Sequence, residues 1–149
     1  MATIQLPPDF KDFLKLLNAE KVEYLLVGGY AVGFHGYPRA TKDMDIWVAV
    51  NPENAERLVR VFQRFGFSPK SISPASFLNE KKVIEIGIDP VRIDVIMSIS
   101  GVSFSECYAQ KVEFIYEGIT INLIDLEHLK SNKRASGRLR DLADLEELS

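Results

Sequence analysis

Residues 27–48 read VGGYAVGFHGYPRATKDMDIWV. Two glycines, Gly28 and Gly29, end an apolar run, and two aspartates, Asp43 and Asp45, follow fourteen residues later on either side of one methionine. The apolar letters IWV come directly after the second aspartate, and burying unpaired acids beside such residues costs free energy. The stretch therefore raises the question of what compensates the two carboxylates.

The composition is that of a globular protein. The 149 residues are 46% hydrophobic and 26% charged, so we predict one domain, 1–149, with a C-terminal helical segment at about 125–149. A net charge of −3 argues against a dedicated nucleic-acid binder, which usually has a broad basic surface.

Targeting and membrane features are not found in the sequence. Cys107 is the single cysteine, which excludes an intrachain disulfide and fits a reducing compartment. The opening letters MATIQLPPDFKDF have neither the basic nor the apolar region of a signal peptide. No apolar run approaches the ~18 to 20 residues that span a membrane. We therefore expect a cytoplasmic protein that makes no membrane contact.

Helix-like and strand-like segments are mixed along the chain. Asn51 and Pro52 are typical of a helix start, and Gly66 is typical of a helix end. Alternating apolar runs between turn residues predict strands. The predicted fold class is α+β, a small mixed sheet flanked by helices. The expected helices are 8–22, 30–34, 52–65 and a tail from 125 with a break near 136–137; the expected strands are 24–27, 43–50, 83–88, 92–99, 112–116 and 119–124, with 89–90 joining two of them; residues 68–79 are expected to form a loop.

The two aspartates lie on one face of the strand predicted at 43–50. Alternate side chains of a strand share a face, so Asp43 and Asp45 point one way while Met44 and Ile46 point into the core. Two like charges about 6 to 7 Å apart repel each other, and a divalent cation would relieve the repulsion. The alternative is an exposed edge strand with two solvated acids.

A third acid, Asp94, is embedded in the apolar run RIDVIM at residues 92–97. If the two strands are neighbours, Asp94 lies beside the Asp43 and Asp45 pair at the ~4.8 Å spacing between strands. Three carboxylates on one sheet face suit a two-metal site for phosphoryl transfer. The alternative for Asp94 is a salt bridge to a basic residue such as Arg92 or Arg39.

Gly28 and Gly29 supply the complementary half of such a site. A strand that ends in two glycines and opens a helix presents backbone N–H groups that a phosphate can approach closely. The alternative is a turn that merely needs a positive φ. The glycines and the acids together predict a triphosphate held opposite metal ions.

Several segments, taken in order, resemble a known family. Together they resemble the nucleotidyltransferase fold of the DNA polymerase beta superfamily, and more closely its small AbiEii-like and minimal nucleotidyltransferase members. The resemblance implies a fold of the polymerase beta palm type and covers nearly the whole chain. The similar segments are YLLVGGYA at 24–31, HG at 35–36, RATKD at 39–43, RID at 92–94 with 98–101, NKRA at 132–135 and GRLRDL at 137–142.

By this resemblance, Asp43 and Asp45 are paired metal ligands, and Asp94 is the third catalytic carboxylate and helps to activate the acceptor hydroxyl. The implied cofactors are two Mg²⁺ or Mn²⁺ ions. Gly28 and Gly29 would bind the triphosphate. Many members of the superfamily carry serine where Gly29 stands, so backbone N–H groups must serve here.

The resemblance also assigns nucleotide binding to Arg39, Thr41, Lys133 and Arg138, with Lys133 the stronger candidate of the last two. The alternative for Arg39 and Thr41 is an ordinary turn. Basic residues near the C-terminus are otherwise solvated or pair with acids such as Asp141 and Asp144 at helical spacing. This basic group comprises Lys130, Lys133, Arg134, Arg138 and Arg140.

The implied reaction moves an NMP group from an NTP to an acceptor hydroxyl and releases pyrophosphate. Relatives modify proteins, RNA or small molecules, and some act in toxin–antitoxin pairs, so the acceptor stays open. A chain of 149 residues leaves no large second domain for the acceptor, and we expect a partner toxin or antitoxin protein, or a homo-oligomer, to complete the site. The alternative is a binding module for nucleotide or a toxin partner with little turnover.

Overall fold

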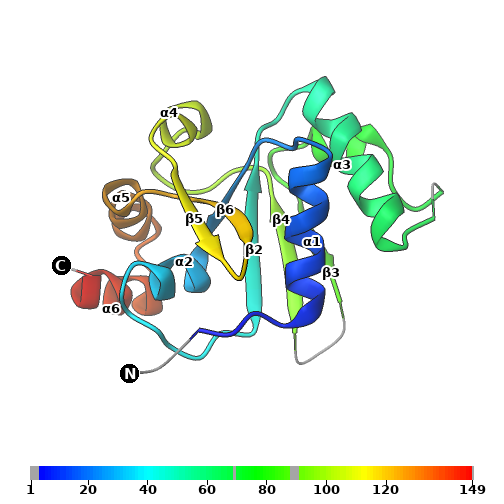
Figure 1. Cartoon of the computed structure of the whole chain (residues 1–149). Coiled ribbons are helices and arrows are strands. Elements are labelled where there is room, and N and C mark those ends of the chain that lie inside the picture. Colours follow the sequence, from blue (N-terminus) through cyan, green and yellow to red (C-terminus); the bar gives the residue numbers. More distant parts are fainter. Residues whose placement is uncertain (1–3, 69, 88–90, 149) are drawn as a thin grey trace.

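A mixed sheet of six strands, in the order β3-β4-β2-β1-β6-β5, forms the centre of the computed structural model, which describes residues 4–68, 70–87 and 91–148 (Figure 1). β2 runs parallel to β4 and β1 runs parallel to β6, whereas the other neighbouring pairs are antiparallel. The two strands with embedded acids are therefore direct neighbours. The strands are β1 (Tyr24–Val27), β2 (Asp43–Val48), β3 (Val83–Ile86), β4 (Arg92–Ile96), β5 (Val112–Tyr116) and β6 (Ile119–Leu123).

Helices cover the sheet from two sides. Figure 1 shows α1 and α3 on one side and α4, α5 and α6 on the other. Within the described ranges, no helix has the length and apolar character needed to cross a membrane. The predicted α+β class with a mixed sheet is confirmed. The helices are α1 (Pro8–Ala19), α2 (Gly28–Phe34), α3 (Pro52–Phe65), α4 (Phe104–Ala109), α5 (Leu126–Ser136), α6 (Leu139–Leu148) and a 3-10 turn, η1 (Pro74–Phe77).

Capping residues explain where α3 and α5 begin and end. The Asn51 side chain accepts a hydrogen bond from the first turn of α3, and Asp125 does the same for α5. Gly66 and Gly137 end these helices in the left-handed conformation, which glycine adopts without a steric penalty. The predicted break near residues 136–137 is therefore confirmed, and it folds α6 back onto α5.

One part of the core lies between the sheet and the α1–α3 layer. Phe13 of α1 packs edge-to-face on Phe62 of α3 with ring centroids 5.8 Å apart. Met44 and Ile46 of β2 are completely buried, as the alternating pattern predicted. The carboxylates of Asp43 and Asp45, which alternate with them, consequently belong to the opposite face of the sheet, on the side of α4, α5 and α6.

Several predicted boundaries were wrong. The predicted strands 43–50, 92–99 and 119–124 end earlier, at Val48, Ile96 and Leu123, although Ala49 and Ile124 still donate backbone hydrogen bonds to Glu23 and Leu26. The expected strand 83–88 ends at Ile86, and its last residue lies with the expected joint 89–90 outside the described residues. The expected helix 8–22 ends at Ala19.

Two short helical elements were also missed. The expected loop 68–79 contains η1, which is stabilised by reciprocal hydrogen bonds between Ser73 and Ser76 and buries Phe77 completely. α4, which the sequence pattern did not indicate, is six residues long, too short for a helical period to stand out. It buries Cys107.

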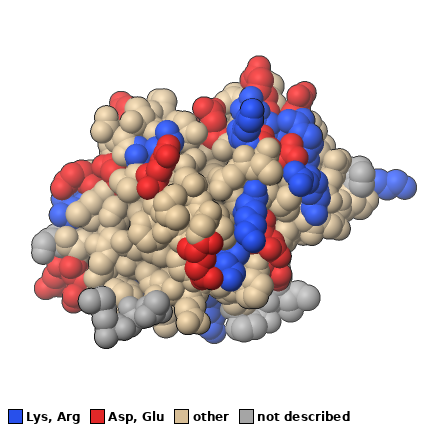
Figure 2. Space-filling view, viewed as in Figure 1, with Lys and Arg blue, Asp and Glu red and all other residues tan. Residues whose placement is uncertain are grey.

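The surface over α1 and α3 is mixed in charge. Figure 2 shows basic and acidic side chains side by side on this face. Glu20 pairs with both Arg60 and Arg64 of α3, and Lys11 of α1 lies 3.6 Å from Glu117. These exposed pairs contribute little to stability individually.

Candidate active site

The register of β2 and β4 gathers four charged side chains on one face of the sheet. Asp43 is the neighbour of Arg92, and Asp45 is the neighbour of Asp94. All four occupy alternate positions of their strands, so their side chains share a face. The prediction that the third aspartate lies beside the first two is therefore confirmed.

Arg92 bridges two of the three aspartates. Its Nη2 donates to Asp43 Oδ2 at 3.1 Å, and its guanidinium donates to both Asp94 oxygens at 2.8 and 3.1 Å. The hydrogen bond and charge of Asp94 raise the pKa of Arg92 further above its ordinary value. The salt bridge considered as the alternative for Asp94 is thus present, with Arg92 as its partner.

Asp45 receives less compensation than its neighbours. Burial raises the pKa of its carboxyl to about 7, and the charges of Asp94 and Asp43 add to the effect. Lys133 and Arg92 oppose this shift without cancelling it. One guanidinium against three carboxylates leaves this part of the sheet with excess negative charge.

The donor chemistry of this acidic face fits Mg²⁺ or Mn²⁺, because both ions prefer hard carboxylate oxygens. The unrelieved repulsion at Asp45 points the same way. Among the residues that the structure describes, no three Asp, Glu, His or Cys side chains converge as metal ligands do. Asp43 and Asp94 are instead paired with the guanidinium of Arg92.

Gly28 and Gly29 allow the backbone of the β1–α2 turn to contact the side chains of the acidic strand. Gly28 has a φ of +72°, and a Cβ atom there would lie 2.2 Å from Asp45 Oδ2. A Cβ atom at Gly29 would lie 2.8 Å from the Oγ1 of Thr41. Any larger residue would collide at either position, so the glycines allow the β1–α2 turn to lie directly beside the acidic strand.

We expect Gly28→Ala to destabilise the protein by about 2 to 4 kcal/mol, since it combines a positive φ with a collision against Asp45. Gly118→Ala is the matched control. Gly118 has a φ of +81°, but a Cβ atom there meets nothing within 4 Å, so we expect a loss of only about 1 kcal/mol. Urea unfolding of both variants measures the difference, and equal losses would show that the Asp45 contact does not matter.

A second charged group faces the acids from α5 and α6. Lys133 is buried and its Nζ lies 2.8 Å from Asp141 and 3.2 Å from Asp144. Arg39 donates to both oxygens of Asp144 at 2.8 and 2.9 Å, and Arg138 donates to Asp141 at 2.8 Å. Three cations against two carboxylates leave this group with excess positive charge.

The structure therefore confirms the alternative for Lys133 and Arg138, in which these basic residues pair with acids. Arg39 also pairs with an acid. Asp141 and Asp144 were considered only as partners for surface charges, yet both are almost completely buried. The sequence did contain a signal for this burial. The two aspartates are three residues apart on α6, so they lie on one side of that helix, and this side faces a lysine of α5. The neighbouring Lys130 instead lies 3.9 Å from the exposed Glu127.

One cavity of about 370 Å³ joins the acidic and basic groups. Gly28 and Asp45 line it together with Lys133 and Arg138. Segments more than eighty residues apart in the chain therefore meet around a single space. Its charged lining residues are the carboxylate of Asp45 from the sheet and the cations of Lys133 and Arg138.

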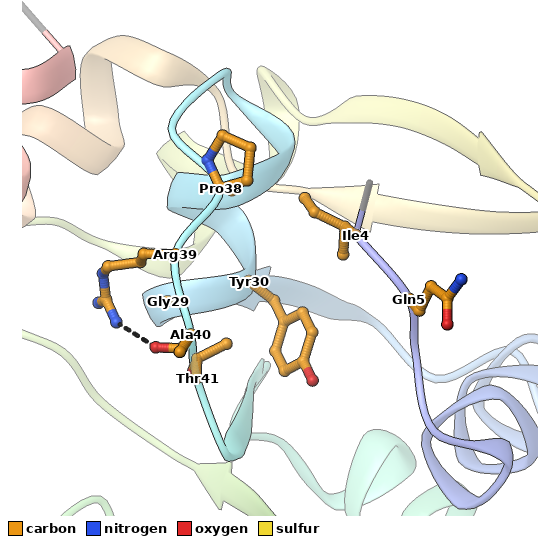
Figure 3. A pocket seen from close by; sticks show the side chains of 9 residues that line it. Ile4, Gln5, Gly29, Tyr30, Pro38, Arg39, Ala40 and Thr41 are labelled. Atoms are coloured by element: carbon orange, nitrogen blue, oxygen red, sulfur yellow. Dashed lines mark hydrogen bonds between the residues drawn. The ribbon is translucent and has the colours of Figure 1, made fainter. Parts of the chain in front are cut away.

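Three of the predicted nucleotide-binding residues line a separate cavity of about 370 Å³, shown in Figure 3. Gly29, Arg39 and Thr41 contribute to it, together with Tyr30. In Figure 3 the Arg39 side chain turns to the opposite side of segment 38–41 from the Tyr30 ring. Thr41 donates to the backbone oxygen of Asp43 at 3.3 Å, and Tyr30 packs edge-to-face on Phe10. The predicted nucleotide-binding residues are therefore distributed over two cavities.

Solved structures with the same architecture decide the fold. A protein from Thermotoga maritima, provisionally named a nucleotidyltransferase, superposes with a TM-score of 0.64 at 18% identity, covering 96% of this chain and 94% of that one. This is a nucleotidyltransferase fold. An antigenic nucleotidyltransferase-like protein from Paracoccidioides brasiliensis superposes with a TM-score of 0.56 at 15% identity, covering 93% of this chain and 72% of that one. No family model matches the sequence, and no curated protein matches it significantly.

The nucleotidyltransferase fold confirms the fold that the sequence resemblance implied. At such low identity the superpositions carry the architecture alone, and the more specific AbiEii-like grouping stays a prediction. In this nucleotidyltransferase fold, the three aspartates lie on adjacent parallel strands and the glycine turn lies directly beside them.

Proposed function

We propose that the chain is a metal-dependent nucleotidyltransferase, which moves an NMP group from an NTP to an acceptor hydroxyl. The observation that supports this most directly is the cavity shared by Gly28, Asp45, Lys133 and Arg138. A triphosphate with divalent cations carries both signs of charge close together. Such a ligand complements a space that is lined by the carboxylate of Asp45 and by the cations of Lys133 and Arg138.

Asp43, Asp45 and Asp94 are the residues that would hold the cations. Bound there, a divalent cation neutralises phosphate charge and lowers the pKa of a hydroxyl. Lys133 and Arg138 attract the phosphates, and Gly28 lets them approach the backbone.

In the proposed reaction, Asp94 accepts the proton of the acceptor hydroxyl. The hydroxyl oxygen forms a bond to the α-phosphorus, the bond from that phosphorus to the bridging oxygen breaks, and pyrophosphate leaves. The enzyme contributes positioning and charge stabilisation, with no covalent intermediate on the protein.

The second candidate is a module that binds nucleotide or a partner protein with little turnover. One observation favours it: the salt bridges of Arg92 engage two of the three proposed metal ligands. In the catalytic reading the same guanidinium competes with the cations, because Asp43 and Asp94 must leave it to bind metal.

Arg92→Gln separates these readings. We expect the variant to bind Mn²⁺ about tenfold more tightly, because it removes a competing positive charge from Asp43 and Asp94. Isothermal titration calorimetry with Mn²⁺ alone measures the change. Arg60→Gln is the control, since Arg60 pairs with Glu20 on the surface and its loss should leave Mn²⁺ affinity unchanged. Unchanged or weaker Mn²⁺ binding by the Arg92 variant would favour the binding module.

The test of the proposed function is nucleotide transfer itself. The chain is incubated with Mg²⁺, a cell lysate and each of ATP, CTP, GTP and UTP, labelled at the α-phosphate. Label on protein, RNA or a small molecule identifies the acceptor class, and Asp43→Asn should abolish it. Label on a toxin-like protein would indicate the toxin–antitoxin role. Tight binding of Mg²⁺ and NTP without any transfer would instead favour the binding module.

A further inference from the structure

The helix α6 has an inverted distribution of polar and apolar side chains. On its inner side, Asp141 and Asp144 are buried and pair with Lys133. On its outer side, Leu139 is 87% exposed and Leu142 is 42% exposed. A helix that packs on a core usually shows the opposite pattern, with apolar residues inside and charged residues outside. The chain therefore leaves an apolar part of α6 uncovered.

The spacing of the residues along α6 gathers this apolar part on one face. Residues three, four and seven positions apart lie on the same side of a helix. Leu139 therefore shares a side with Leu142, Ala143 and Glu146, all of which are exposed. We call these four residues the outer face of α6. Ala143 lies near its middle, and this small side chain allows a second helix to approach closely.

Two opposite charges border the outer face. Arg140 and Glu147 are exposed and seven residues apart, so they lie on the same side of α6, about 10 Å apart along its axis. This spacing exceeds the three or four residues at which side chains of one helix pair. In the part of the chain that the structure describes, neither side chain has an ion-pair partner. Both charges are therefore free to pair with another molecule.

We propose that the outer face of α6 binds the same face of a second copy of this chain, with the two helices antiparallel. A two-fold axis brings residue i of one copy to residue j of the other, and j to i. With the axis near Ala143, Arg140 of each copy meets Glu147 of the other, and the exposed leucines pack between the copies.

The charges select both the partner and the direction. A parallel pair of the same helices would place Arg140 against Arg140 and Glu147 against Glu147, which is unfavourable. The antiparallel pair forms two ion pairs instead. Because the pattern is complementary to itself, it favours a second copy over an unrelated helix. The proposed dimer does not depend on the proposed function.

The expected dimer is weak, because the contact is small. The ten residues of α6 span about 15 Å, and one face of such a helix buries less than the ~800 Å² per partner of a standard interface. We expect a dissociation constant of about 100 µM for the full chain. Sedimentation velocity between about 10 µM and about 1 mM measures it. A protein that remains monomeric throughout this range would overturn the proposal.

Charge reversal tests the antiparallel arrangement. Arg140→Glu and Glu147→Arg each place like charges opposite one another, so each variant alone should dimerise at least about tenfold more weakly than the wild type. An equimolar mixture of the two variants restores both ion pairs and should regain the wild-type affinity. Lys82→Glu makes the same charge change at an exposed position beside β3 and should have no effect. Single variants that dimerise like the wild type, or a mixture that stays monomeric, would contradict the arrangement.

Leu139→Gln tests the apolar part of the contact. Because this leucine is exposed, its replacement should leave the fold intact but weaken the dimer about tenfold. Val83→Gln is the matched control, since Val83 is also exposed and belongs to β3, on the opposite side of the molecule from α6 (Figure 1). We expect this control to dimerise like the wild type. Equal affinities of the two variants would show that the outer face of α6 is not the interface.

Discussion

Asp45→Asn is expected to lower the rate of nucleotidyl transfer by at least about 10³-fold, since an amide removes charge where the proposed metal and phosphate meet. Asp45 lines the shared cavity, and the turn at Gly28 lies directly against it. The rate with α-labelled NTP and the acceptor found in lysate measures the effect. Asp12→Asn, an exposed change on α1, should retain full activity. A loss below tenfold at Asp45 would place the chemistry elsewhere.

Asp45→Asn, which lowers activity, is expected to raise the stability of the folded protein. The folded pKa of Asp45 is about 7, above its ordinary value of 3.8, so the folded state binds this proton more tightly than the unfolded state. Its stabilising effect is complete below pH 4 and is lost as the pH rises through 7. Asparagine does not ionise, and solvent screens part of the effect. We therefore expect Asp45→Asn to gain about 1 to 2 kcal/mol over the wild type at pH 8.

Urea unfolding in the presence of EDTA, at pH 4 and pH 8, checks this expectation. The gain should be present at pH 8 and small at pH 4, where the wild-type carboxyl is protonated. A stability difference that does not change between the two pH values would contradict the raised pKa. Activity and stability moving in opposite directions is the behaviour expected of a functional carboxylate held in an unfavourable environment.

Lys133→Met is expected to destabilise the protein by about 3 to 5 kcal/mol, because it leaves Asp141 and Asp144 buried without their shared cation. Lys130→Met is the matched control on the same helix. Lys130 lies 3.9 Å from an exposed glutamate, so its loss should cost under about 0.5 kcal/mol. Thermal and urea unfolding at pH 7 compare the two variants, and similar costs would contradict the buried network.

A second substitution identifies the cause. Adding Asp141→Asn to Lys133→Met removes one of the two buried carboxylates that lost the lysine and should recover about half of the lost stability. In the wild type, burial opposes ionisation of Asp141, but hydrogen bonds from Lys133, Ser136 and Arg138 outweigh it and lower its pKa to about 2. That stabilisation is present above pH 4 and is lost as the pH falls toward 2. No recovery in the double variant would place the damage in packing instead.

Much of the fold could be predicted because the deciding signals are local. Strand alternation placed Met44 and Ile46 in the core, and Asn51 and Gly66 marked the ends of α3. The part that failed concerns elements without a periodic signal. α4 is too short to show a helical period, and η1 depends on burying Phe77 in a core assembled from distant segments.

The candidate site divides in the same way. The sequence by itself determined which groups are present: two aspartates on one strand face, a third on another strand, a glycine turn and a basic C-terminal segment. Only the tertiary structure decided their partners, because charge pairing depends on distances between segments that the chain order does not specify. It placed Arg92 between Asp43 and Asp94, and it buried Lys133 against two acids of α6.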